Sequence, residues 1–182
     1  MIQDIANQLW YKKQPRLVLL LYPIAWIYRM IVGVRRFVLT RFFQTKFDVP
    51  VIVVGNITVG GVGKTPLVIA LAKHLAARGH HVGIVSRGYG AKIKQFPYQI
   101  QLEDVASQVG DEPLLLAQKT GVPVVIAPKR VQAIHYLLAQ NKKINVILSD
   151  DGLQHYKMAR AIEIVVMDGK RGCGNGLCLP AG

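Results

Sequence analysis

Apolar and polar residues alternate along this chain in blocks that predict strands and helices in turn. Compact apolar runs rich in β-branched residues predict strands buried on both faces, whereas longer stretches with apolar residues at helical spacing predict helices. Strands are expected at residues 49–54, 81–86, 98–102, 123–127, 145–149 and 162–167, and helices at 67–77, 114–121 and 131–141. This alternation predicts an α/β fold with a mostly parallel, doubly wound sheet.

A different pattern precedes the alternation, an uninterrupted apolar run at residues 17–28. A membrane-spanning helix needs about 20 apolar residues, and the run reaches that length only by including Arg29 and tolerating Pro23. We expect a membrane-associated helix that lies in or dips into the cytoplasmic leaflet. A single spanning helix and a helix packed on the domain are the alternatives.

Charge reinforces this division of the chain. The 182 residues carry a net charge of +13. Up to Lys46 there are eight basic residues and one acid, Asp4, which is a net +7. Such an excess of basic residues implies an anionic partner, and the candidates are nucleic acid, anionic lipid and a phosphorylated substrate. We therefore predict a basic, apolar membrane anchor at residues 1–46 and a core domain at 47–182.

The first predicted strand leads into a glycine-rich turn and a helix, which is the layout of a phosphate-binding loop. In such loops backbone N–H groups and a helix N-terminus bind phosphates, a lysine reaches the β/γ oxygens, and a hydroxyl holds Mg²⁺. The strict motif has a glycine where this chain has Thr58. The residues predicted to bind ATP are Thr58, Val59, Gly60, Gly61, Val62, Gly63, Lys64 and Thr65.

An apolar strand that closes on aspartates is the usual partner of such a loop. The predicted strand at 145–149 runs into Asp150 and Asp151. We expect these carboxylates to hold Mg²⁺ together with Thr65, although two adjacent acids could also form a solvated turn.

Other strand exits are expected to converge on the same edge of the sheet. Asp111 and Glu112 precede a predicted helix, so they either cap that helix or place a general base near the phosphates. Pro113 is expected to keep its preceding residue out of the helix. Arg130 follows another strand and is a candidate for stabilising charge in the reaction.

Several strings together resemble one known family, the tetraacyldisaccharide 4'-kinases, which make lipid A in Gram-negative bacteria. They are VGNITVGGVGKTP, SRGYG, VGDEP, DDGLQH and DGKRGCGNG with LPAG, in this order and across essentially the whole chain. The resemblance implies a P-loop NTPase-like fold. It also implies transfer of the γ-phosphoryl group of ATP to the 4'-hydroxyl of a tetraacyldisaccharide 1-phosphate, at the cytoplasmic face of the inner membrane.

The resemblance also implies roles for individual residues. Lys64 and the loop amides would bind phosphates, and Asp111 would be the base for the sugar hydroxyl. The expected partners are the lipid disaccharide and anionic inner-membrane lipid, with no nucleic acid. Gln154 and His155 match the DDGLQH string without an assigned role.

The chain departs from the family pattern in two respects. Leu177 stands where an arginine is expected after GNG. Family members are also longer, so the resemblance implies a second half after LPAG. That half contains a histidine expected to pair with Asp111, and activity is not expected from the present stretch alone.

Two other functions share some of these features. Membrane-associated partitioning-type ATPases share the GGVGKT core, but their signature lysine would fall at Val59. A nonenzymatic basic protein that binds membranes or nucleic acid would account for the charge, but not for the phosphate-binding loop with its aspartate pair.

Overall fold

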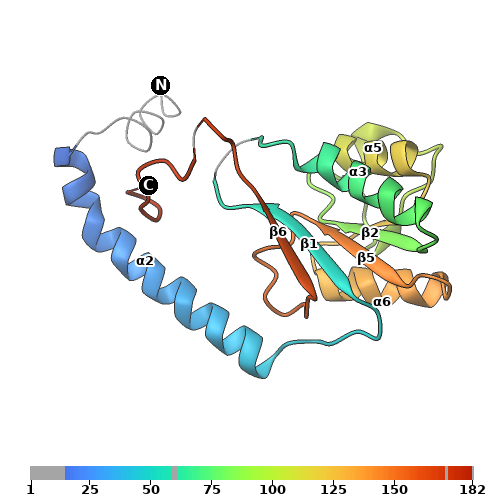
Figure 1. Ribbon diagram of the computed structural model, residues 1–182, viewed down its shortest axis with the longest axis horizontal. Helices are drawn as coiled ribbons and strands as arrows, with labels where there is room; N and C mark the ends of the chain where they lie inside the picture. Colours follow the sequence, from blue (N-terminus) through green and yellow to red (C-terminus); the bar gives the residue numbers. More distant parts are fainter. Residues whose placement is uncertain (1–14, 59–60, 171, 182) are drawn as a thin grey trace. The chain divides into compact units, whose positions relative to one another are not determined.

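The computed structural model describes residues 15–58, 61–170 and 172–181. The chain divides into two compact units, considered separately below (Figure 1). The larger unit comprises residues 44–56 and 61–166, and the smaller one residues 1–43, 57–60 and 167–182. The predicted domain boundary after residue 46 stays a prediction.

The larger unit is a six-stranded sheet with helices on both faces. Its strand order is β3-β4-β2-β5-β1-β6, and every pairing is parallel except β3 with β4. The elements are β1 (Val51–Asn56), α3 (Lys64–Ala77), β2 (Val82–Ser86), β3 (Tyr98–Gln99), α4 (Ala106–Val109), α5 (Asp111–Thr120), β4 (Val124–Ile126), α6 (Arg130–Gln140), β5 (Val146–Asp150) and β6 (Ile162–Val166). The mostly parallel, doubly wound sheet predicted from the sequence is confirmed.

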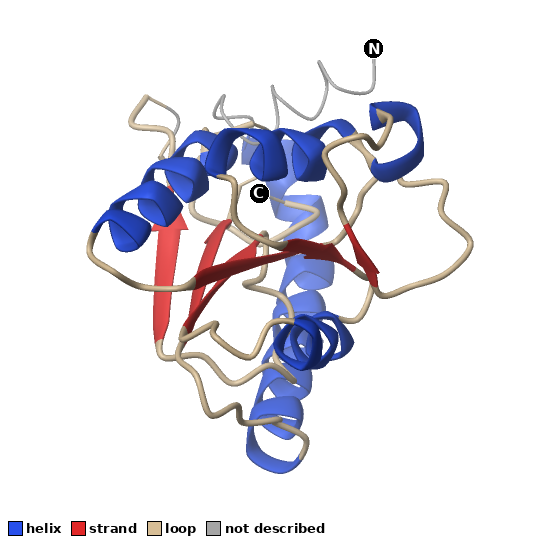
Figure 2. Cartoon of the chain, turned by 90° about the vertical axis from the view of Figure 1, so that its right-hand side faces the viewer, coloured by secondary structure: helices blue, strands red, loops and turns tan. Residues whose placement is uncertain are grey.

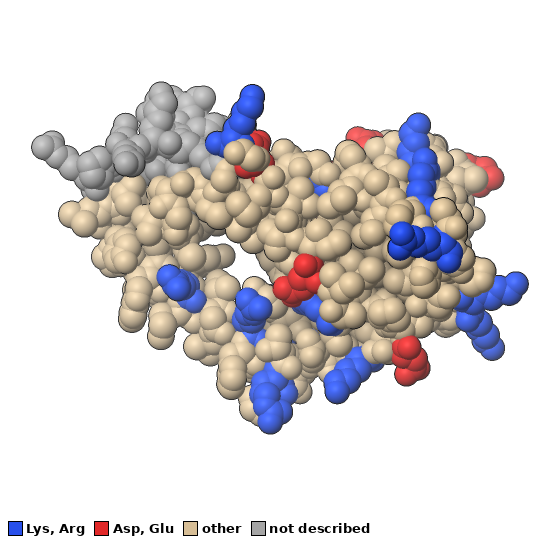
Figure 3. All heavy atoms as spheres, in the orientation of Figure 1, with Lys and Arg blue, Asp and Glu red and all other residues tan. Residues whose placement is uncertain are grey.

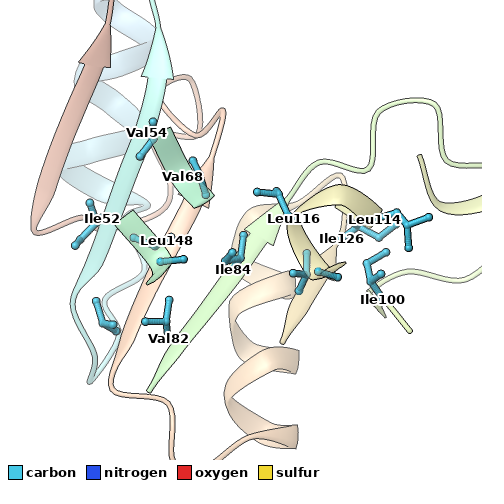
Figure 4. Packing of buried hydrophobic residues seen from close by; sticks show 14 of the residues in the cluster. Ile52, Val54, Val68, Val82, Ile84, Ile100, Leu114, Leu116, Ile126 and Leu148 are labelled. Atoms are coloured by element: carbon cyan, nitrogen blue, oxygen red, sulfur yellow. The ribbon is translucent and has the colours of Figure 1, made fainter. Parts of the chain in front are cut away.

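Alternate residues of the central strands face opposite layers of helices, as the period of a strand requires. Ile52 and Val54 of β1 join a buried cluster with α3, α4 and α5 (Figure 4). Val51 and Val53 join a second cluster, which includes residues of α6. Figure 2 shows the twisted sheet with helices on both sides. Burial on both faces explains why these strands read as continuous apolar runs.

The register of β1 and β5 brings the end of β1, where the predicted phosphate-binding loop begins, beside the acidic pair. Val54 lies opposite Asp150 in adjacent parallel strands. Since parallel strands end at the same edge, the chain leaves β1 and β5 at neighbouring points of the sheet.

The structure corrects three local predictions. The strand expected at 98–102 has only two residues, Tyr98–Gln99, and pairs antiparallel with β4 at the edge of the sheet. The helix α4 was not predicted. Helix α5 begins at Asp111, so Pro113 did not keep Glu112 out of the helix. Proline is accommodated in a first helical turn because its missing N–H would have no intrahelical partner there.

The described part of the smaller unit contains one long helix, α2 (Pro15–Phe42), which continues through Pro23 and Arg29. By length and composition alone, the segment Val18–Phe42 of this helix could cross a membrane. Large apolar side chains are exposed along it, including Leu19, Trp26 and Ile31. Figure 3 shows lysine and arginine atoms separated by wide uncharged areas on the face drawn there.

Candidate active site

The predicted phosphate-binding loop joins β1 to α3, and it ends in a glycine with a left-handed backbone. Gly63 is the N-cap of α3 and has φ 80°, a left-handed conformation that glycine adopts without steric cost. The cap residue, a glycine, has no side chain that could bond the first N–H groups of α3, which is the arrangement found in anion-binding helix starts. The predicted ligands Val59 and Gly60 lie outside the described residues. Thr58 is half-buried and belongs to the smaller unit.

Lys64 connects the loop to two strand ends. Its Nζ donates to Asn56 Oδ1 at 2.6 Å and to Asp151 Oδ1 at 2.8 Å. The side chain of Lys64 is 21% exposed and that of Asp151 is 59% exposed. The lysine is therefore held at the open edge of the sheet, where it can exchange a partner for a phosphate oxygen. Asn56 was not singled out from the sequence, although it lies within GNITVGG.

Thr65 contacts a residue of the string VGDEP. Its Oγ1 donates to Glu112 Oε1 in a long hydrogen bond of 3.5 Å. The sequence paired Glu112 with Asp111 as a candidate cap or base, but it did not predict the contact of Glu112 with Thr65. Asp111 is the exposed first residue of α5, and Gly110 is the N-cap. Neither acid is the N-cap residue, as side-chain capping would require, but both lie in the first turn of α5, where negative charge interacts favourably with the helix dipole.

A close backbone approach joins SRGYG to VGDEP. Gly110 has φ 93°, and a Cβ at this position would lie 2.8 Å from the carbonyl oxygen of Tyr89. Nearby, the Lys92 N–H donates to Gln108 O at 2.7 Å. Glycine is required at residue 110 because of its positive φ and because the Tyr89 carbonyl oxygen leaves no room for a side chain. The close approach holds the start of α5, with Asp111 and Glu112, against the loop after β2.

Arg130 turns inward beneath the acidic pair. The residue is 1% exposed, and it donates from Nη2 to Asp150 O at 2.7 Å and from Nη1 to Ala127 O at 3.2 Å. Burial lowers the pKa of Arg130 to about 10, so the guanidinium is charged at neutral pH. Its hydrogen bonds are thus to backbone carbonyls at the ends of β4 and β5, rather than to the carboxylates.

Asp150 is buried, whereas its neighbour Asp151 is exposed. Burial raises the pKa of Asp150 to about 6; the nearby charge of Glu112 adds to the rise, and that of Arg130 opposes it. Within the described chain Asp150 Oδ1 is buried without a hydrogen-bond partner. A buried carboxylate oxygen without a donor is the kind of group that a cation satisfies.

The segment after the acids places His155 in positive surroundings. Burial, followed by the charges of Arg130 and Arg87, lowers the pKa of His155 to about 4. His155 is therefore a neutral imidazole at physiological pH. Gln154 is exposed.

The sequence as a whole matches one protein family. The model of the family described as "Tetraacyldisaccharide-1-P 4'-kinase" (LpxK) matches residues 17–182. The chain belongs to this family. The match favours the kinase hypothesis over both a partitioning-type ATPase and a nonenzymatic basic protein.

Individual relatives agree with the family match. A tetraacyldisaccharide 4'-kinase of Legionella pneumophila (strain Corby) is 57% identical over 177 residues, which are 97% of this chain and 54% of the relative. One from Ectopseudomonas mendocina (strain ymp) is 50% identical over 184 residues, 98% of this chain and 54% of the relative. The chain spans about half the length of these curated relatives.

A solved LpxK structure has the same fold. The crystal structure of an "apo" form of LpxK from Aquifex aeolicus in complex with ATP superposes with a TM-score of 0.74 and 33% identity. The superposition covers 91% of this chain and 53% of the Aquifex aeolicus chain.

The chemistry of the side chains at the predicted metal site fits Mg²⁺. Mg²⁺ prefers oxygen ligands and usually keeps several waters beside one or two carboxylates and substrate phosphates. The available donors are all oxygens: the carboxylates of Asp150, Asp151 and Glu112 and the hydroxyl of Thr65. In the part of the chain that the structure describes, no group of three or more acidic, histidine or cysteine side chains could hold a metal ion by itself.

Proposed function

We propose that this chain is the nucleotide-binding half of a lipid A kinase. The enzyme transfers the γ-phosphoryl group of ATP to the 4'-hydroxyl of a tetraacyldisaccharide 1-phosphate. One observation carries the proposal: Lys64, at the start of α3, lies within hydrogen-bonding distance of both Asn56 and Asp151. This arrangement gathers the parts that phosphoryl transfer needs, which are positioning and neutralisation of charge.

The phosphates are bound by the N–H groups of residues 61–65 and by Lys64. Lys64 exchanges its contact with Asp151 for a phosphate oxygen, which leaves that carboxylate free. Thr65 contributes its hydroxyl, and Asp150 and Asp151 contribute carboxylates, to the magnesium ion. Bound Mg²⁺ supplies positive charge that neutralises the phosphate oxygens during transfer.

Asp111 takes the proton of the acceptor hydroxyl. In the balanced step the 4'-oxygen forms a bond to the γ-phosphorus, the bond to the β,γ-bridging oxygen breaks, and ADP leaves. The exposed position of Asp111 at the start of α5 leaves its carboxylate accessible to the acceptor hydroxyl. Arg130 supports the reaction at a distance, through its positive charge beneath Asp150.

Helix α2 attaches the protein to the membrane that contains the lipid acceptor. Its exposed apolar residues suit lipid, and its arginines suit anionic headgroups at the cytoplasmic face. The whole activity belongs to a protein of the relatives' length, in which a second half completes the acceptor site.

The experiment that tests this function is titration of the chain with Mg·ATP by calorimetry in a mild nonionic detergent. Lys64→Met should weaken binding about 10- to 100-fold, the effect of losing a charged hydrogen bond. Lys73→Met, which removes an exposed lysine from the same helix, is the matched control and should bind like the wild type. Equal affinities of wild type and Lys64→Met would refute the assignment.

A further inference from the structure

The segment from Asp151 to Met158 has a backbone that needs support from its surroundings. Asp151 has φ 50°, in the left-handed region that residues other than glycine seldom adopt. At Gly152 an added Cβ would collide with Ser149 Oγ. Such conformations persist only where neighbouring groups hold them.

One side chain contacts this segment at three carbonyl oxygens. Arg160 donates from Nη2 to His155 O at 2.8 Å, from Nη1 to Leu153 O at 3.1 Å and from Nε to Met158 O at 3.3 Å. The arginine side chain is only 9% exposed, so water competes little for these bonds. A rigid, planar guanidinium is suited to such contacts, and lysine cannot reproduce them.

An ion pair with Glu163 is the simpler explanation for Arg160. Nη1 lies 2.9 Å from Glu163 Oε1, three residues along the chain. The Glu163 side chain is 43% exposed, however, and exposed pairs contribute little. The carbonyl contacts are more shielded and more numerous, which makes them the principal interactions of Arg160.

Through its hydrogen bond to Leu153 O, Arg160 holds a residue that packs against β1, next to the phosphate-binding loop. The Leu153 side chain covers Gly55, where an added Cβ would lie 2.6 Å from Leu153 Cγ. Asn56, the next residue of β1, shares Lys64 with Asp151. Holding Leu153 therefore holds Asp151 in place relative to the lysine.

We propose that Arg160 is a positioning residue, which holds residues 151–158 so that Asp151 presents its carboxylate to Lys64 and to nucleotide-bound Mg²⁺. Only the magnesium part rests on the proposed function. The variants are Arg160→Met, which removes all the donors, Arg160→Lys, which keeps the charge but not the planar fork, and Glu163→Gln. The last is the matched control, because it removes the ion pair and leaves the three carbonyl bonds.

Hydrogen exchange of the 182-residue chain without nucleotide tests the first part. The amides of His155 and Met158 form hydrogen bonds within the segment. In Arg160→Met these amides should exchange about 10- to 100-fold faster, the effect of losing at least one charged hydrogen bond. The amides of β5 in that variant, and all amides in Glu163→Gln, should exchange as in the wild type. Unchanged exchange in Arg160→Met would overturn the proposal. Faster exchange throughout the sheet in both Arg160 variants would also overturn it, because Arg160 would then support the whole fold.

ATP affinity with and without Mg²⁺ tests the second part. Loss of a group that orients a metal ligand typically lowers metal affinity about 10- to 100-fold. The gain in ATP affinity from Mg²⁺ should fall by about that factor in Arg160→Met, less in Arg160→Lys and not in Glu163→Gln. Equal losses with and without Mg²⁺ would show a purely structural role and overturn the proposal. A wild-type chain that binds no ATP would refute the proposed function, while hydrogen exchange would still decide whether Arg160 holds Asp151.

Discussion

Replacing Asp150 by asparagine should stabilise the protein at neutral pH. The residue is 3% exposed, and burial raises the pKa of its carboxyl from an ordinary value of 3.8 to about 6. The folded protein therefore binds a proton more tightly than the unfolded chain does. A rise of this size corresponds to about 3 kcal/mol of folding free energy lost when the carboxylate is charged.

The sign of this effect defines a pH window. Below about pH 4 the carboxyl is neutral in both states, so the substitution removes no charge penalty. Between about pH 4 and 6 the unfolded chain ionises this carboxyl while the folded protein keeps its proton, so the stability of the wild type falls relative to Asp150→Asn as pH rises toward 6. The advantage of the variant should thus grow between pH 4 and 6 and then level off. About 3 kcal/mol is its upper limit, because the new amide is itself a buried polar group.

Urea unfolding followed by circular dichroism from pH 4 to 8 measures this difference. Asp151→Asn is the matched control: its side chain is 59% exposed, so the change should alter stability by no more than about 1 kcal/mol. The reasoning is refuted if Asp150→Asn is less stable than the wild type at pH 7.5, or if the difference is the same at pH 4. In Asp150→Asn, Mg²⁺ should raise the affinity for ATP much less than it does in the wild type. Stability and nucleotide binding should therefore change in opposite directions.

Three further predictions concern other parts of the molecule. Asp111→Asn should leave unfolding and Mg·ATP affinity nearly unchanged but slow lipid phosphorylation about 10²- to 10⁴-fold in a protein of the relatives' length; reduced stability with normal turnover would contradict the role as a base. Gly110→Ala should destabilise the fold by more than Gly121→Ala in urea unfolding. Both glycines have positive φ, but only at residue 110 would the new methyl group meet a backbone oxygen, so equal effects would disprove the importance of that contact. Removal of residues 1–43 should release the protein from sedimenting liposomes that contain anionic lipid, and equal sedimentation with and without them would rule out attachment through α2.

Local patterns predicted the strands and the position of the phosphate-binding loop. The apolar runs at 81–86 and 145–149 correspond to β2 and β5 within a residue or so, because strands buried on both faces tolerate few polar residues. The proximity of the acidic pair to the loop followed from parallel pairing. The errors lie where local preference was weak, at β3 and at the start of α5.

The sequence by itself determined the fold class, the glycine-rich connection between β1 and α3 and the long apolar helix, because each depends on the periodicity or spacing of nearby residues. Only the tertiary structure decided where individual side chains point. Arg130 turns beneath Asp150 because it is buried against backbone carbonyls, and Glu112 contacts Thr65 through the packing of α5 beside α3. Such contacts join residues distant in sequence, so they depend on strand register and helix packing, which no local pattern specifies.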